Sequence, residues 1–133
     1  MKYKPKIIDW LLCDDVRMEL HGKTTFVGVY GDDIIVSSIP FKIPQLCVVT
    51  KWDLKNKTFE EISFRIERPD NKDIRPPIKI KPPKTKDKKR YSVILSLFPF
   101  EIPLAGVYKL FVKVDDDIEK KIGEFEVKLS ETK

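Results

Sequence analysis

Apolar and polar side chains alternate along most of this 133-residue chain. A repeat of two residues is the signature of a β-strand with one buried face. Residues 58–68, which come nearest to a helical pattern, also alternate better with period two, so a strand is predicted there. The residues predicted to face the core are Val48, Thr50, Trp52 and Leu54; Ile62, Phe64 and Ile66; Val93, Leu95 and Leu97; Tyr108, Leu110, Val112 and Val114; and Phe125, Val127 and Leu129.

Turn-forming residues separate these runs, with ten prolines mostly between them. A chain of this length fits one domain. We therefore predict a single all-β domain over residues 1–133, an antiparallel β-sandwich of about seven or eight strands with a Pro/Lys-rich loop near residues 70–90. Tyr108 follows a Pro-containing loop and a glycine and opens a strand. This arrangement is typical of the tyrosine corner and favours an immunoglobulin-like sandwich, with a plain core tyrosine as the alternative.

Two adjacent carboxylates, Asp14 and Asp15, interrupt the first apolar run. A two-residue turn at His21-Gly22 would pair Asp15 with Gly28 and place Asp14 on a face that is otherwise apolar. Asp15 and Arg17 would then be neighbours on the opposite face, roughly 7 Å apart, and should pair.

A carboxylate that faces a core is costly unless it is hydrogen-bonded. Either a β-bulge turns Asp14 and Asp15 outward, or Asp14 accepts bonds from the backbone N–H groups of residues 31–33. A cation or acid/base site would instead need Asp32 or Asp33, which the predicted register keeps near 10 Å from Asp14. We therefore interpret the pair as hairpin architecture. Asp14 or Asp15 should be largely buried and bonded to backbone N–H or to Arg17.

The residue types needed for catalysis are sparse. His21 is the one histidine, at a turn tip, and Cys13 lies eight residues away on an extended strand. The chain contains neither a CxxC or HExxH motif nor a Gly-rich phosphate loop. The run 115–117 of three aspartates could ligate calcium, but aspartate is also a preferred hairpin-turn residue. We expect no enzyme, no cofactor and no metal, and we expect Cys13 and Cys47 to be buried thiols rather than a disulfide.

Residues 72–90 hold nine basic and two acidic side chains, a net +7 in a chain of +5, so the remainder is −2. Two interpretations are open. Ile78 and Ile80 can form a short edge strand that prolines and lysines protect. Alternatively the segment binds nucleic acid or an acidic protein, although no aromatic platform accompanies it before Tyr91. The candidate partner-binding residues are Lys84, Lys86, Lys88, Lys89 and Arg90.

A family resemblance rests on two stretches, CDDVRMELHGKTTFVGVYGDDI and IPFKIPQLCVV. They resemble a family of small uncharacterised prokaryotic proteins with a Cys-Asp-Asp-Val-Arg-like strand, a Gly-Lys turn and a Gly-Val-Tyr strand end. The resemblance covers about the first 50 residues and departs from the family pattern in the loop after Ile35. It implies a compact single domain and no established activity.

Together these features predict a non-catalytic binding or scaffold module with a protein partner, and they leave homo-oligomerisation open. The alternative is a nucleic-acid-associated protein that uses residues 72–90. Because no run approaches the ~20 apolar residues of a membrane helix and no targeting segment is visible, we expect a cytoplasmic protein.

Glutamine in place of Lys84, Lys86, Lys88, Lys89 and Arg90 tests the two interpretations of the basic segment. If the segment protects a sheet edge, folding is retained and self-association rises, because the repelling lysines are gone. We expect neither form to retain DNA or RNA at physiological salt. Titrations at low and moderate salt, run beside light scattering, measure both effects. Micromolar affinity of the unmodified chain at physiological salt, lost in the variant and falling steeply with salt, would establish nucleic-acid binding instead.

Overall fold

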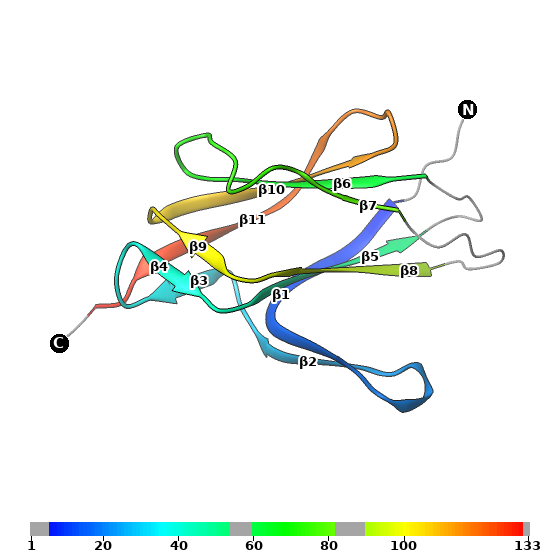
Figure 1. Cartoon of the computed structure of the whole chain (residues 1–133), viewed down its shortest axis with the longest axis horizontal. Helices are drawn as coiled ribbons and strands as arrows, with labels where there is room; N and C mark the ends of the chain where they lie inside the picture. Colours follow the sequence, from blue (N-terminus) through cyan, green and yellow to red (C-terminus); the bar gives the residue numbers. More distant parts are fainter. Residues whose placement is uncertain (1–5, 54–59, 82–89, 132–133) are drawn as a thin grey trace.

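A computed structural model describes residues 6–53, 60–81 and 90–131. Within these ranges the chain is nearly all β, as predicted (Figure 1). One sheet has the order β2-β1-β5-β8 and the other β3-β11-β10-β6-β7, while β4 and β9 form a separate pair. The strand bounds are β1 Lys6–Met18, β2 Thr24–Val29, β3 Asp33–Val36, β4 Phe41–Ile43, β5 Leu46–Asp53, β6 Ile62–Glu67, β7 Ile78–Ile80, β8 Arg90–Leu97, β9 Phe100–Ile102, β10 Gly106–Val114 and β11 Lys120–Leu129. Neighbouring strands are antiparallel except β3 and β11, which are parallel.

The described residues form more strands than the seven or eight predicted, partly because prolines divide longer pairings. Leu46 pairs with Leu97 in the β5–β8 ladder, and Ile43 pairs with Phe100 in the β4–β9 pair. These two pairs fit one continuous register that is interrupted around Pro44 and Pro99. Proline has no backbone N–H and cannot donate to a ladder. The short strands β4 and β9 therefore lie where no strand was predicted.

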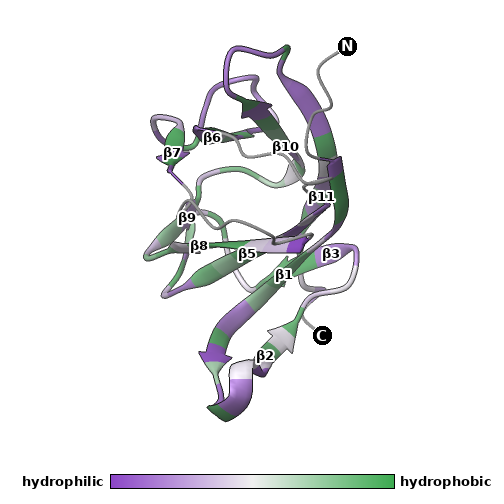
Figure 2. Cartoon of the chain, turned by 90° about the vertical axis from the view of Figure 1, so that its right-hand side faces the viewer, coloured by the Kyte–Doolittle hydropathy of each residue, from purple (hydrophilic) through white to green (hydrophobic). Residues whose placement is uncertain are grey.

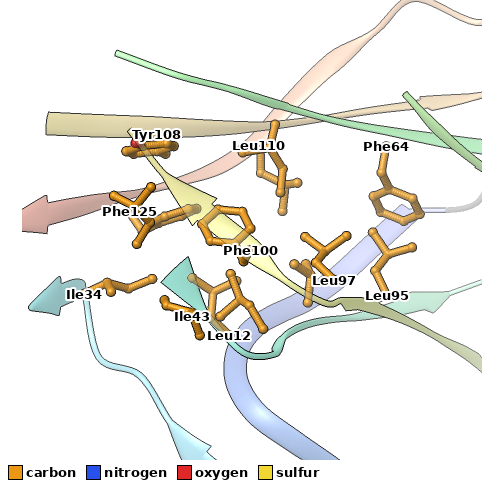
Figure 3. Packing of buried hydrophobic residues seen from close by; sticks show 14 of the residues in the cluster. Leu12, Ile34, Ile43, Phe64, Leu95, Leu97, Phe100, Tyr108, Leu110 and Phe125 are labelled. Atoms are coloured by element: carbon orange, nitrogen blue, oxygen red, sulfur yellow. The ribbon is translucent and has the colours of Figure 1, made fainter. Parts of the chain in front are cut away.

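The main core lies between the two large sheets and draws buried side chains from both (Figure 3). The predicted inward residues Phe64, Tyr108, Leu110, Val112 and Val127 are all buried. Phe100 from β9 joins Tyr108 and Phe125, with ring centroids 5.3 to 6.5 Å apart. Leu129 was predicted to face inward as well, and this is wrong: it is 51% exposed at the end of β11.

Tyr108 makes the predicted corner contact. Its hydroxyl donates a hydrogen bond of 2.7 Å to the backbone carbonyl of Leu104. Burial raises the pKa of the Tyr108 phenol, so the hydroxyl stays protonated and remains a donor at neutral pH. The bond fixes the loop before β10 against the strand that supplies much of the core.

The triple aspartate run forms the β10–β11 turn and has a structural role. Asp115 has a φ of 51°, and its Oδ1 accepts hydrogen bonds of 2.8 and 2.9 Å from the backbone N–H groups of Glu60 and Glu61. Within residues 6–53, 60–81 and 90–131, no group of three or more His, Cys, Asp or Glu side chains could hold a metal ion. In the same ranges the only helix is the three-residue 3-10 turn Leu20–Gly22, which is too short to cross a membrane.

Truncation of a core side chain tests this packing. Leu110 is 1% exposed, so Leu110→Ala should lower the free energy of unfolding by about 2–5 kcal/mol through cavity formation. Ile118→Ala is the matched control, because Ile118 is 78% exposed in the β10–β11 turn, and it should change stability by about 0.5 kcal/mol or less. Denaturant unfolding measures both. A loss below about 1 kcal/mol for Leu110→Ala would mean that the faces of β10 are inverted.

Candidate functional site at the base of the β1–β2 hairpin

The hairpin between β1 and β2 closes through a 3-10 turn, Leu20–Gly22, in which His21 has a φ of 63°. The strands pair Met18 with Thr24 and Asp15 with Val27. The predicted pairing of Asp15 with Gly28 is therefore wrong by one residue. The reason is that the turn holds three residues where a two-residue loop was expected.

Gly28 consequently faces Asp14. A Cβ atom at Gly28, whose φ is +66°, would lie 2.3 Å from Asp14 Oδ2. Glycine is needed here both for the left-handed backbone conformation and for the close approach of the carboxylate.

β1 changes sides between Cys13 and Val16. Leu12 packs in the main core, while Cys13 lies on the outer face of the sheet with Cys47 and Val49. Strict alternation would turn Val16 inward, yet Val16 packs against the same outer cluster as Cys13. The pairing of β1 with β5 ends at Cys13, whereas its pairing with β2 continues to Met18. The hairpin therefore leaves the sheet at Asp14-Asp15 and projects from the body (Figures 1 and 2).

This break turns the carboxylates outward, as the predicted bulge would. Unlike a bulge, it does not shift the β1–β2 register. The prediction that one carboxylate is largely buried is wrong, because Asp14 is exposed and Asp15 only half-buried. The predicted bonding is confirmed for Asp15. Its carboxylate accepts the Val16 backbone N–H at 2.9 Å and lies 3.6 Å from Arg17 Nε. It also accepts a bond of 3.3 Å from the Gln45 side chain.

Asp14 has a partner that the sequence did not indicate. The Tyr30 hydroxyl donates a 2.7 Å hydrogen bond to Asp14 Oδ1, whereas one of the two predicted alternatives had the backbone N–H groups of residues 31–33 as the donors. The Tyr30 backbone N–H donates to the Leu12 carbonyl at 2.8 Å, which holds the tyrosine beside β1. Burial, together with the Asp14 carboxylate, raises the pKa of the Tyr30 phenol, so Tyr30 remains a donor at neutral pH. In the part of the chain that the structure describes, no basic side chain forms an ion pair with Asp14.

A pocket of about 460 Å³ opens beside this pair. This volume lies in the usual range for small-ligand sites. Asp14 and Tyr30 line it from the base of the hairpin, and Gln45 lines it from the residue before β5. The remaining lining residues are Ile34, Ile35, Val36, Phe41, Ile43 and Pro44. Carboxylate, phenol and amide groups thus meet an apolar wall built by β3 and β4.

A second pocket of about 390 Å³ shares Phe41 with the first. Its cations are Lys42 and Arg68. Glu101 lies 3.9 Å from the Lys42 ammonium, and Asp70 accepts a 2.7 Å bond from Arg68. Each cation of this pocket therefore already has an anion beside it, Glu101 within the lining and Asp70 next to it.

Cys13 and Cys47 are direct cross-strand neighbours, and both are buried and free, as predicted. Burial raises the pKa of the Cys13 thiol to about 11, so little thiolate is present at neutral pH and the thiol is a poor nucleophile. His21 lies at the far tip of the hairpin. The structure therefore does not bring these groups together as a catalytic pair.

Of the candidate residues in the basic segment, Lys84, Lys86, Lys88 and Lys89 lie outside the described residues. Arg90 opens β8 with an exposed side chain opposite Asp53. The predicted edge strand is confirmed as β7, which pairs with β6 at the end of its sheet. A binding role for the segment stays a prediction.

The structure defines an all-β protein of two packed sheets with a ligand-sized pocket at the base of a projecting hairpin. The chain belongs to the family of unknown function DUF6941, which it matches over residues 8–128. This range includes the hairpin and every residue of the pocket, and it confirms the resemblance to a family without known function. A comparison with the curated proteins finds no match.

Alanine at Gly28 tests the contact between the hairpin and Asp14. Gly28→Ala should push Asp14 away from Tyr30 and remove a hydrogen bond, in addition to the strain of a left-handed alanine. Gly22→Ala is the matched control, because Gly22 has a φ of +74° but a Cβ atom there would meet nothing within 4 Å. Strain alone should cost about 1–2 kcal/mol, and Gly28→Ala should cost more.

The alkaline titration of Tyr30, followed by NMR, gives a second readout. In Gly28→Ala the Tyr30 pKa should fall towards its ordinary value, because the nearby carboxylate no longer disfavours the phenolate. In Gly22→Ala it should not change. Equal stability losses together with an unchanged Tyr30 pKa in Gly28→Ala would contradict the described contact.

Proposed function

We propose that this chain is a non-catalytic, immunoglobulin-like binding module that engages a protein partner through the outer edge of β2. The partner supplies an extended segment that adds to the four-stranded sheet as a further strand. The observation that carries the proposal is an unprotected sheet edge on a hairpin that projects from the body.

The strand order supports the immunoglobulin-like part of the proposal. Immunoglobulin sandwiches place strands A, B and E in one sheet and C, F and G in the other. Here β1, β5 and β8 are neighbours in the four-stranded sheet, as A, B and E are. In the five-stranded sheet β6, β10 and β11 are neighbours, as C, F and G are. The hydrogen bond from Tyr108 to Leu104 lies at the start of β10, the strand equivalent to F.

The edges of the two sheets differ in their protection. β2 is an outermost strand, and its sequence TTFVGV contains neither a charge nor a proline. β7 is outermost in the other sheet, where Pro76 and Pro77 precede it and the exposed Lys79 lies within it. Prolines and lysines are common devices against unwanted strand pairing. β2 lacks both, and unlike β8, the other outer strand of its sheet, it lies on the projecting hairpin, which favours β2 as the strand that pairs.

Exposed apolar side chains on the hairpin add to this argument. Met18 is 72% and Leu20 is 81% exposed, and Val27 and Val29 of β2 are also exposed. These side chains contribute nothing to the core between the sheets, but they offer apolar contacts to an added strand. In strand addition, main-chain hydrogen bonds supply affinity and alternate side chains supply specificity.

The same proposal places the module in the cytoplasm. Cys13 and Cys47 are opposed across a strand pair and remain free thiols, which fits a reducing compartment. A second copy of the chain can also supply the partner strand, through antiparallel β2–β2 pairing about a twofold axis.

The test uses a variant that protects the edge. Thr25 and Val27 are exposed on β2, so Thr25→Lys with Val27→Lys should leave the fold intact while opposing strand addition. Ser92→Lys with Ser96→Lys is the matched control on β8, the other outer strand of the same sheet, where both serines are exposed. Peptides selected from a displayed library on the wild-type chain should bind the β8 variant and not the β2 variant.

Two further readouts locate the contact. A bound peptide should slow hydrogen exchange at the backbone amides of β2, and sedimentation should show whether the chain alone self-associates through the same edge. Self-association that only the β2 variant loses would identify a second copy as the partner. Binding that survives the β2 variant, or protection confined to β8, would contradict the proposal.

A further inference from the structure

We propose that the pocket lined by Asp14, Tyr30 and Phe41 binds an organic cation, a protonated amine or guanidinium group carried on a short apolar stem. This site is separate from the outer edge of β2, and the inference does not depend on strand addition there. The cation can be the basic side chain of a peptide or a free amine, since both present the same chemistry to the pocket.

The charge of the pocket sets the sign of its ligand. Among the described residues, Asp14 and Tyr30 are the only ionisable ones that line it, and the protonated Tyr30 phenol is neutral. The carboxylate of Asp15, next in sequence, already has Arg17 as an ion-pair partner and Gln45 as a hydrogen-bond donor. The partner of the Asp14 carboxylate is the neutral Tyr30 hydroxyl, so the lining keeps a formal charge of −1. A carboxylate can accept several hydrogen bonds at its two oxygens, and a ligand with N–H donors and a positive charge complements it.

The rest of the lining selects an organic ligand over a metal ion. A calcium ion takes six to eight oxygen ligands, and the described lining of this pocket offers one carboxylate. Its apolar wall is built by β3 and β4, which contribute the buried Ile34 and Ile43, both labelled in Figure 3. Ile35 is 66% exposed on the same strand as Ile34. An aliphatic stem would cover apolar surface that is otherwise in contact with water.

Two aromatic residues strengthen the case for a cation. Tyr30 and Phe41 both line the pocket, and ring faces attract ammonium and guanidinium groups. Tyr30 is held at both ends, by its backbone N–H to Leu12 and by its hydroxyl to Asp14. Its ring is therefore positioned before any ligand arrives, which reduces the entropy lost on binding.

The experiment titrates butylammonium and butylguanidinium into the 15N-labelled chain and follows the backbone amides by NMR. Both should give saturable shifts at Tyr30, Ile35 and Val36. Pentanol is the neutral control of similar size, and it should bind about 10-fold more weakly or worse, because a hydrogen bond between charged groups is lost. This comparison uses the wild-type chain alone, so it holds even where a variant fails to fold.

A variant pair then assigns the charge. Asp14→Asn keeps an acceptor for the Tyr30 hydroxyl and removes the charge, so it should weaken both cations about 10-fold or more. Asp116→Asn, in the exposed β10–β11 turn, should leave their affinity unchanged.

N-acetyl-arginine amide and N-acetyl-lysine amide separate the two sources of the cation. Tighter binding than that of the free cations identifies a peptide side chain, and weaker binding identifies a free amine. Equal binding of pentanol, unchanged affinity in Asp14→Asn, shifts confined to another surface or no saturable shift with any probe would each overturn the inference.

Discussion

The change of sides in β1 between Cys13 and Val16 determines where the hairpin leaves the sheet, and the free edge of β2 and the pocket depend on it. Before it, Leu12 closes the main core and Cys13 packs on the outer face, so β1 is an ordinary member of a sheet. After it, β1 keeps β2 as a partner and loses β5. The hairpin that results leaves an edge of β2 without a partner strand in the described part of the chain, and a pocket lies at its base.

The same break explains why two adjacent carboxylates are tolerated within a strand. A carboxylate turned into the core would lose its hydration without compensation, whereas Asp14 is exposed and Asp15 is half-buried and bonded. Gly28 makes room for Asp14 on the opposite strand. Asp14 is thereby held beside Tyr30 with no cationic partner among the described residues. The geometry of the hairpin therefore supplies the charge of the proposed cation pocket.

Much of the fold could be predicted from the sequence because strand periodicity is a local property. Ile62, Phe64 and Ile66 lie in the segment that comes nearest to a helical pattern, yet period two fits it better, and all three are buried. The hairpin register could not be predicted, since it depends on a left-handed His21 that adds one residue to the turn. The pocket was also missed, because Tyr30 and Phe41 come to line one pocket only through the arrangement of β1, β3 and β4. The local signal nearest to it was the acidic pair at Asp14-Asp15.

The central claim is that the hairpin leaves the sheet at Asp14-Asp15, and the most direct measurement is a set of cross-strand nuclear Overhauser contacts in solution. The account predicts backbone contacts between Asp15 and Val27, and between Met18 and Thr24. It also predicts that no backbone-to-backbone contact joins residues 16–18 to β5, whose pairing with β1 ends at Cys13, although the Val16 side chain touches the Cys47 and Val49 cluster. Contacts that show Asp15 paired directly with Gly28 in place of Val27, or backbone contacts between residues 16–18 and β5, would contradict it.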